Sequence, residues 1–213
     1  MGLLKLTTEN APATPAAGTV TTYFDTSTKP TLRLVDQNGN NNQVSPLVNS
    51  SGSSNAQAPA AATRTYLTGS AITVPAQKVK VGTVYRCRIA ISQTSAGAAT
   101  GTIDVAVGTA GTTADTARCS FTKPASTNVA DEGIIDILVT VTTASASGVL
   151  QGECLITHNL ATTGLINQQV SVTKNASGTF DLTVANLIFG VCITTGASDV
   201  VTITQVFAEM LNC

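Results

Sequence analysis

Alternation of side-chain character along short segments is the feature that most constrains the fold of this chain. Between Val79 and Thr116, two such segments are separated by a stretch of Gly, Ala, Ser and Thr. Successive side chains of a β-strand point to opposite faces of its sheet, so a period of two predicts strands with one apolar face. The apolar positions are Tyr85, Cys87, Ile89 and Ile91 in the first segment and Ile103, Val105 and Val107 in the second.

The same pattern recurs over the C-terminal two-thirds of the chain, with glycine-containing turns between the segments. No segment repeats its apolar positions with the 3.6-residue period of a helix. Short strands at this spacing predict an all-β fold, and their number favours a jelly-roll-like antiparallel sandwich over an immunoglobulin sandwich. The predicted strands are residues 65–68, 71–74, 83–92, 102–107, 117–121, 134–142, 149–157, 170–174, 179–184, 187–194 and 200–211.

Continued alternation assigns individual side chains to the core or to the surface. It places Val184 and Phe207 in the core. It places Asp104 on an outer strand face, where its carboxylate could form a weak ion pair with Arg86 or Arg88.

The chain divides by composition into three predicted parts. Residues 1–43 form an extended arm, in which prolines prevent a helix, followed by a small β-hairpin that ends at an Asn-Gly turn. Residues 44–63 are rich in Ser, Asn, Gly and Ala and carry no charge, which predicts a flexible linker. Residues 64–213 form the sandwich. Because a lone hairpin is marginally stable in water, we expect residues 1–43 to need a partner surface.

Charged residues make up only 11% of the chain, and the net charge is −1. This composition gives no basic surface for nucleic acid, and it suggests that much of the polar, uncharged surface lies against other subunits. The N-terminal sequence lacks the apolar segment of a signal peptide, and no run is long enough to span a membrane. We therefore expect synthesis in a cytoplasm, no membrane partner, and release by a route such as lysis.

The five cysteines are odd in number, and none lie in a CxxC pair. Two of them, Cys87 and Cys119, fall at inward positions of predicted strands. Free cysteine packs as a small hydrophobic side chain, so we expect reduced, buried thiols rather than disulfides. Cys213 is the last residue and is expected to be exposed.

The sequence offers few groups for catalysis. His158 is the only histidine, and one histidine builds neither a His-rich zinc site nor a recognisable triad. The glycines at 108 and 111 resemble half of a phosphate loop but lack the following lysine and helix, and Asp131-Glu132 lacks a calcium-loop pattern. Aromatic residues make up 4%, which disfavours sugar binding without excluding it. We predict no enzymatic activity, no catalytic residues, no metal site and no cofactor.

Two stretches carry a resemblance to proteins of tailed bacteriophages. Residues 15–39, with Pro15-Ala-Ala-Gly18, Tyr23-Phe24-Asp25 and Asp36-Gln37-Asn38-Gly39, resemble the N-terminal attachment segments of phage fibre and decoration proteins. Residues 82–116, with Gly82-Thr-Val-Tyr85 and the loop from Gly108, are similar to jelly-roll head domains that form trimeric fibres or spikes on capsids and tails.

The resemblance implies a structural virion protein, made in the host cytoplasm and assembled as a homotrimer. Residues 1–43 would attach to the major capsid protein or another virion protein, and residues 64–213 would trimerise and project. The alternative is a tail fibre that binds a host-surface glycan. The attachment residues are expected to be Tyr23, Phe24, Leu32 and Leu34. Small, uncharged loops suit close contacts between identical subunits, and the expected trimer contacts are Gly108, Gly111, Ala114 and Asp115.

Overall fold

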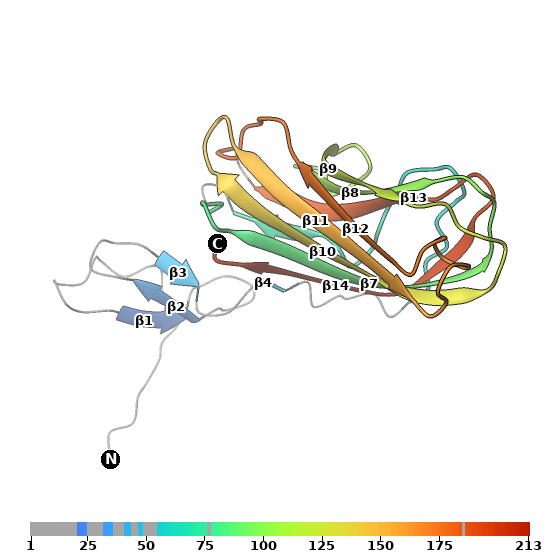
Figure 1. Cartoon of the computed structure of the whole chain (residues 1–213). Helices are drawn as coiled ribbons and strands as arrows, with labels where there is room; N and C mark the ends of the chain where they lie inside the picture. The colour runs from blue at the N-terminus through green and yellow to red at the C-terminus, as the bar shows by residue number, and fades with distance from the viewer. Residues whose placement is uncertain are drawn as a thin grey trace, which may run out of the picture.

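The computed structural model describes residues 55–75, 78–184 and 186–213 in full, together with the backbone of four short strands before them (Figure 1). Every regular element in these residues is a β-strand, and two antiparallel sheets form a sandwich. The predicted all-β sandwich is therefore confirmed. In the described part of the chain there is no helix of the length and apolarity that a membrane crossing requires.

The first sheet of the sandwich has six strands in the order β12-β11-β10-β7-β14-β4. Strands β10, β11 and β12 follow one another both in sequence and in the sheet, with a short connection between β10 and β11 and a longer loop, residues 159–169, between β11 and β12. The strands are β4 (Leu47–Val48), β7 (Val84–Ser95), β10 (Asp131–Thr143), β11 (Val149–His158), β12 (Val170–Ala176) and β14 (Val200–Leu211).

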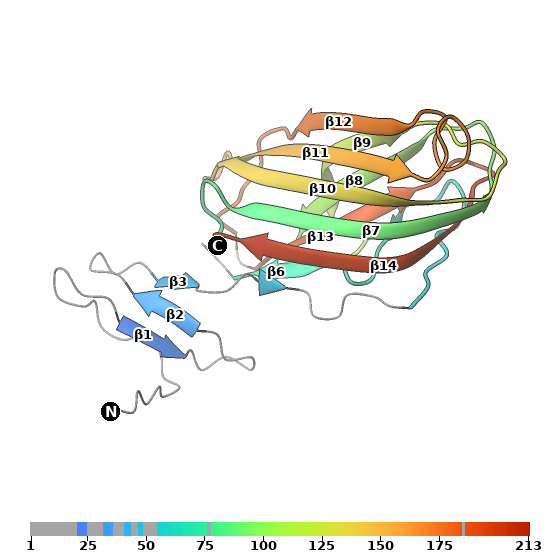
Figure 2. The ribbon, with the colours of Figure 1, turned by 60° about the horizontal axis from the view of Figure 1, so that its bottom comes forward.

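The second sheet has the order β5-β13-β8-β9, with β6 also paired to β13. It lies behind the first sheet in Figure 1, and the two layers are seen from another side in Figure 2. The chain changes sheet between β4 and β5, β6 and β7, β7 and β8, β9 and β10, β12 and β13, and β13 and β14. The strands are β5 (Thr65–Tyr66), β6 (Ile72–Val74), β8 (Gly101–Gly108), β9 (Thr116–Lys123) and β13 (Leu187–Thr194).

One hydrophobic core fills the space between the two sheets, as the alternation predicts. Tyr85 of β7 stacks on Phe189 of β13 with ring centroids 5.9 Å apart, and its hydroxyl donates a 2.8 Å hydrogen bond to the carbonyl of Ser70. All five cysteines are free, and four of them are buried, while Cys213 is partly exposed. Burial raises the pKa of the Cys87 and Cys154 thiols to about 12, so both stay protonated and unreactive at neutral pH.

Two predicted core residues lie on the surface instead. The backbone of β14 contains a bulge: Ile203 pairs with Ile91, but Gln205, two residues later, pairs with the adjacent Ala90. The extra residue reverses the alternation, so Val206 is buried and Phe207 is 41% exposed. Val184 is also exposed, because the predicted strand at residues 179–184 is an irregular segment.

Asp104 lies on the outer face of β8, as the alternation predicts, but that face is covered by Arg64, and the ion pair of Asp104 is with Arg64 rather than with Arg86 or Arg88. Asp104 is 3% exposed, and its carboxylate accepts hydrogen bonds from Arg64 Nε at 3.0 Å and Arg64 Nη2 at 2.6 Å. Tyr66 lies over the neighbouring strand, where a Cβ at Gly190 would overlap the Tyr66 ring. Part of the outer face of the second sheet is therefore buried beneath Arg64 and Tyr66.

Two regions that precede the sandwich in sequence form β-pairings. Strands β1 (Thr21–Phe24), β2 (Leu32–Val35) and β3 (Asn41–Gln43) form a small antiparallel sheet, which includes the predicted hairpin. The segment predicted as a flexible linker is partly fastened to the sandwich, because β4 pairs with β14 and Gln57 exchanges two backbone hydrogen bonds with Ile203. Residues 1–18, predicted to be extended, lie outside the described residues.

Candidate functional site

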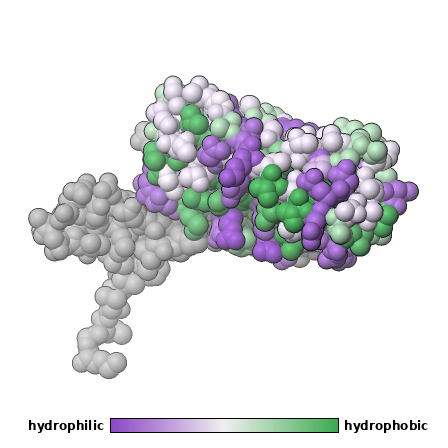
Figure 3. Space-filling view, viewed as in Figure 1, coloured by the Kyte–Doolittle hydropathy of each residue, from purple (hydrophilic) through white to green (hydrophobic). Residues whose placement is uncertain are grey.

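The broad outer face of the six-stranded sheet is the candidate site, because it combines exposed apolar side chains with charges of both signs. Val172 is 61% exposed and Phe207 41% exposed, which is unusual for large apolar side chains at strand positions. Figure 3 shows apolar and hydrophilic residues side by side on this surface. The exposed apolar side chains of the outer face are Leu138, Val170, Val172, Phe207 and Leu211.

The register of the strands arranges the outer face in lateral rows. One row runs across five strands and alternates in charge about a central leucine: Lys174, Glu153, Leu138, Arg86 and Glu209. The next row is more apolar and consists of Val172, Leu155, Asp136, Arg88 and Phe207. Cross-strand neighbours of opposite charge attract one another, so each row is internally compatible.

Two ion pairs lie within these rows. Arg86 Nη1 is 3.3 Å from Glu209 Oε1, and Arg88 Nε is 3.7 Å from Asp136 Oδ1. Both arginine side chains are more than half exposed, so water screens these pairs and each contributes little to stability. Their charges remain available to a partner surface.

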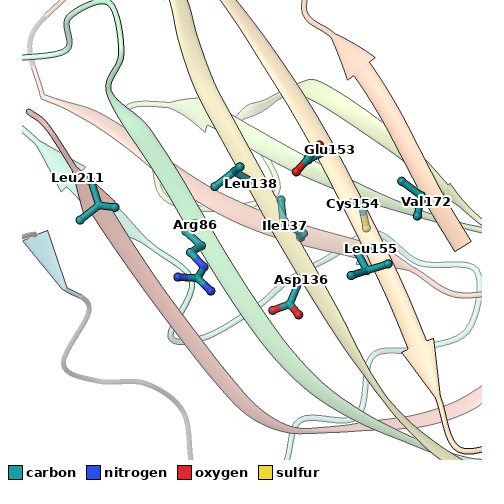
Figure 4. A pocket seen from close by; sticks show the side chains of 9 residues that line it. All are labelled: Arg86, Asp136, Ile137, Leu138, Glu153, Cys154, Leu155, Val172 and Leu211. Carbon is teal, nitrogen blue, oxygen red and sulfur yellow. The ribbon is translucent and has the colours of Figure 1, made fainter. Parts of the chain in front are cut away.

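A hollow of about 450 Å³ lies on the outer face between β7 and β12 (Figure 4). Its lining includes Arg86, Asp136, Leu138, Glu153 and Val172. Figure 4 shows these side chains spread across neighbouring strands of one sheet rather than converging on one point. The geometry suits contact with a broad surface more than capture of a small substrate.

The loop between β8 and β9, which was predicted to make trimer contacts, is organised by Asp115. The Asp115 carboxylate accepts hydrogen bonds from the backbone N–H groups of Ala110, at 3.0 Å, and Gly111, at 2.7 Å. Gly111 has a φ of +65°, and a Cβ at Gly108 would overlap the Asp115 carboxylate. Ala114 is exposed, but Asp115 is buried, so Asp115 acts on any contact only by shaping the loop.

Loops at one end of the sandwich bury a second polar cluster around the single histidine. His158 Nδ1 is 2.6 Å from Asp131 Oδ2, and His158 Nε2 is 2.7 Å from the carbonyl oxygen of Gln168. Both side chains of the pair are fully buried. Burial raises the pKa of Asp131, but hydrogen bonds from Leu165 N–H, His158 and Glu132 N–H outweigh burial and lower that pKa overall. The histidine therefore has a structural role, fastening the segment after β11.

A third buried cluster joins Lys123 at the end of β9 to Asp199 in the turn before β14. Lys123 Nζ contacts Ser126 Oγ and lies 3.5 Å from Asp199 Oδ2, and the two charged side chains are 1% and 0% exposed. Ser126 Oγ in turn donates to the carbonyl of Leu165 at 3.0 Å. Desolvation lowers the pKa of Lys123, although the nearby carboxylate opposes that effect.

Sequence reasoning missed this cluster, although one indication was present. Cys119 and Phe121 occupy inward positions of β9, and Lys123 continues the same alternation. A lysine at a core position needs a buried partner. The partner could not be identified, because Asp199 is 76 residues away in sequence.

The residues expected to attach the protein to a virion lie on β1 and β2. The backbone register of β1 and β2 sets Phe24 opposite Leu32 and Tyr23 opposite Arg33, with Leu34 one residue before the end of β2. No group of three or more His, Cys, Asp or Glu side chains within the described residues is arranged to hold a metal ion.

Comparisons with known proteins do not assign the chain to a family. No family model and no curated protein matches its sequence. One similar solved structure is a fructofuranosidase variant from Schwanniomyces occidentalis complexed with fructosylnystose, with a TM-score of 0.22 and 8% identity. The match covers 89% of this chain and 38% of that chain. A similarity at this level carries no argument about activity.

Proposed function

We propose that this protein is a structural virion protein of a tailed phage, a capsid decoration protein or head fibre that associates with further copies of itself. Residues 1–43 would attach it to the major capsid protein or another virion protein, and the sandwich would project. The sequence resemblance supplies the phage setting. The outer face of the six-stranded sheet supplies the physical argument for self-association.

The row that runs from Lys174 to Glu209 carries the argument. Read in reverse, it presents the opposite charge at every charged position, with Leu138 at the centre in both directions. A second copy laid face to face, with the row reversed, would set Lys174 against Glu209 and Glu153 against Arg86. Self-complementarity of this kind is what a contact between identical subunits requires.

The exposed apolar side chains add a driving force to this charge pattern. Leu138 would meet its own copy at the centre, and Val172 would meet Phe207 of the neighbour in the second row. Asp136, at the centre of the second row, would face its own copy, with Arg88 of the same subunit 3.7 Å from each Asp136 carboxylate to offset the like charges. Burial of such side chains contributes roughly 25 cal/mol for each Å² of apolar surface removed from water. A homotrimer formed through the loop at 108–115 would use a different surface, so one particle can contain both contacts.

Attachment through the N-terminal region is consistent with the way the chain enters the sandwich. Residues 47–48 and Gln57 pair with β14 at the edge of the six-stranded sheet. These pairings fasten the connecting segment and cover part of an edge that would otherwise be open to other strands. These backbone hydrogen bonds would transmit to the sandwich any mechanical load on the attached residues 1–43.

A tail fibre that binds a host-surface glycan is the second candidate. The hollow on the outer face carries both carboxylates and apolar side chains, which a sugar ring can contact. The two candidates differ in location and copy number. Head decoration predicts many copies spread over the capsid, and a tail fibre predicts a handful at one vertex.

The proposal is tested on purified phage particles whose genome encodes this chain. Quantitative mass spectrometry gives the copy number, and antibody labelling in the electron microscope gives the location. Many copies over the head support the proposal, a few copies at the tail support the adhesin, and absence from the particle overturns both. Deletion of residues 1–43 should leave a folded sandwich that no longer binds particles lacking the protein, and retained binding would refute the attachment role.

A further inference from the structure

The buried pair of Lys123 and Asp199 has an arrangement that an ordinary ion pair does not explain. Lys123 Nζ faces only one carboxylate oxygen, at 3.5 Å, whereas charged hydrogen bonds between nitrogen and oxygen are usually about 2.7–2.9 Å. The other oxygen, Asp199 Oδ1, is buried and has no hydrogen-bond partner among the described residues. A buried carboxylate with one oxygen lacking a hydrogen-bond donor is costly, because its charge is only partly compensated.

We propose that Lys123 and Asp199 condense to form an intramolecular isopeptide bond, which links the end of β9 covalently to the turn before β14. The Lys123 amine would attack Asp199 Cγ, a new Nζ–Cγ bond would form, and the Cγ–Oδ2 bond would break once Oδ2 has taken up two protons from the ammonium group. The ammonium and carboxylate together lose one water molecule and become a neutral secondary amide. No oxidant, reductant or other reactant is needed.

The surroundings favour both the attack by the amine and the loss of water from the carboxyl group. Desolvation lowers the pKa of Lys123, which raises the share of neutral amine whose lone pair can attack. Asp199 Oδ2 accepts a 3.0 Å hydrogen bond from Gly196 N–H, which stabilises negative charge on the carboxyl group as the amine adds. Oδ2, the oxygen that the proton donors reach, then leaves as water, and Oδ1 becomes the oxygen of the amide.

Ser126 is placed to move the proton. Its hydroxyl contacts Lys123 Nζ and lies 3.4 Å from Asp199 Oδ2, so it touches both reacting groups. It can accept protons from the attacking amine and pass protons to Oδ2, which then leaves as water. Its hydrogen bond to the Leu165 carbonyl fixes its position. Ser126 is thus a proton-relay residue for bond formation.

The fold holds the reacting groups together without access to bulk water. Lys123 pairs with Gly101 across β8 and β9, and a Cβ at Gly101 would lie 3.5 Å from Lys123 Cδ, so the lysine stem runs over the glycine. The two side chains are 1% and 0% exposed. Fixed proximity in a dry site replaces the high concentration that amide formation otherwise requires, and the product removes two buried charges.

The test is the intact mass of the purified full-length chain under denaturing, reducing conditions. The proposal predicts a mass below the sequence mass by one water molecule, and a tryptic fragment in which the Lys123 peptide is joined to the Asp199 peptide. Lys123→Met and Asp199→Ala should each restore the full mass expected of their sequences. Asp199→Asn should lose ammonia instead of water, because the leaving group is then the amide nitrogen.

Ser126→Ala provides a variant that keeps both reacting groups. It should fold and form the bond several-fold more slowly, so that uncrosslinked chain is seen soon after purification and declines with time. Asp181→Asn, at an exposed position before β13, serves as a matched control and should show the wild-type loss of water. A wild-type chain that keeps its full sequence mass after prolonged incubation overturns the proposal, and so does a water loss mapped to other residues. Neither result bears on where the protein sits in a virion.

Discussion

Arg64 and Asp104 are joined by two parallel hydrogen bonds, Nε to Oδ2 at 3.0 Å and Nη2 to Oδ1 at 2.6 Å, across 40 residues of sequence. Arg64 Nη1 also donates to the carbonyl oxygens of Thr113, at 2.6 Å, and Asp115, at 3.0 Å. The Arg64 guanidinium therefore holds three parts of the chain together: the segment that leads into β5, strand β8, and the loop at 108–115. The fork geometry of arginine matches this set of acceptors, which a lysine could not reach together.

Replacement of Arg64 should cost much more stability than replacement of a surface arginine. Arg64→Ala leaves the Asp104 carboxylate buried without its partner, so we expect a loss of about 3 kcal/mol in the free energy of unfolding. Arg86→Ala removes an exposed pair with Glu209 and should cost less than about 1 kcal/mol. Urea unfolding of both variants measures the difference, and equal effects would contradict the assigned role of Arg64.

Gly108 should tolerate no side chain, because the Asp115 carboxylate occupies the space beside it. We expect Gly108→Ala to lower the free energy of unfolding by about 1–3 kcal/mol. Gly178→Ala is the matched control, since a Cβ there would meet no atom within 4 Å. The double variant with Asp115→Ala should lose less than the sum of its two single changes. Strict additivity in thermal or urea unfolding would argue against the contact.

The bulge in β14 predicts opposite effects for two neighbouring residues. Val206→Ser places a hydroxyl in the core and should cost about 2–4 kcal/mol of folding stability. Phe207→Ser lies on the surface and should change the stability of the isolated subunit by less than about 0.5 kcal/mol. Chemical unfolding at low protein concentration compares the two. The reverse order of effects would mean that the alternation continues unbroken through β14.

Acid should weaken the cluster around His158 through Asp131. The pKa of Asp131 is lower in the folded chain than the ordinary carboxyl value of about 4 in an unfolded chain. The folded state therefore binds fewer protons, and the stability that Asp131 contributes above about pH 4 is lost as the pH falls through the folded pKa. We expect wild type to lose more stability than Asp131→Asn between about pH 6 and about pH 3 in urea titrations. Parallel pH dependences of the two proteins would contradict this linkage.

Local alternation was enough to predict most of the sandwich, because each strand position follows from the side chains beside it in sequence. It failed at the bulge before Phe207, because one extra residue shifts the alternation by one position. It also failed at Asp104, because Arg64, which is distant in sequence, covers a sheet face that alternation alone assigns to the surface. The outer face depends on register between five strands, so neither of its rows is visible in any one segment. Lys123 was visible as an anomaly, but Asp199 could be matched to it only in three dimensions.

The face-to-face contact between copies is the central claim, and charge exchange across the lateral row tests it most directly. Arg86→Glu alone and Glu153→Arg alone should each weaken association, because like charges would then face each other between copies. The double variant should restore association, because each new charge would again meet its opposite. Thr122→Glu, at an exposed position of β9 in the other sheet, is the control and should associate as the wild type does.

Sedimentation equilibrium of the wild type and these variants gives the decisive result. The account predicts a wild-type mass that is a multiple of the 21.6 kDa subunit, dissociation in each single charge variant, and recovery in the double variant. A wild type that sediments as a 21.6 kDa monomer at high protein concentration would contradict it. So would an oligomer that neither single charge variant weakens.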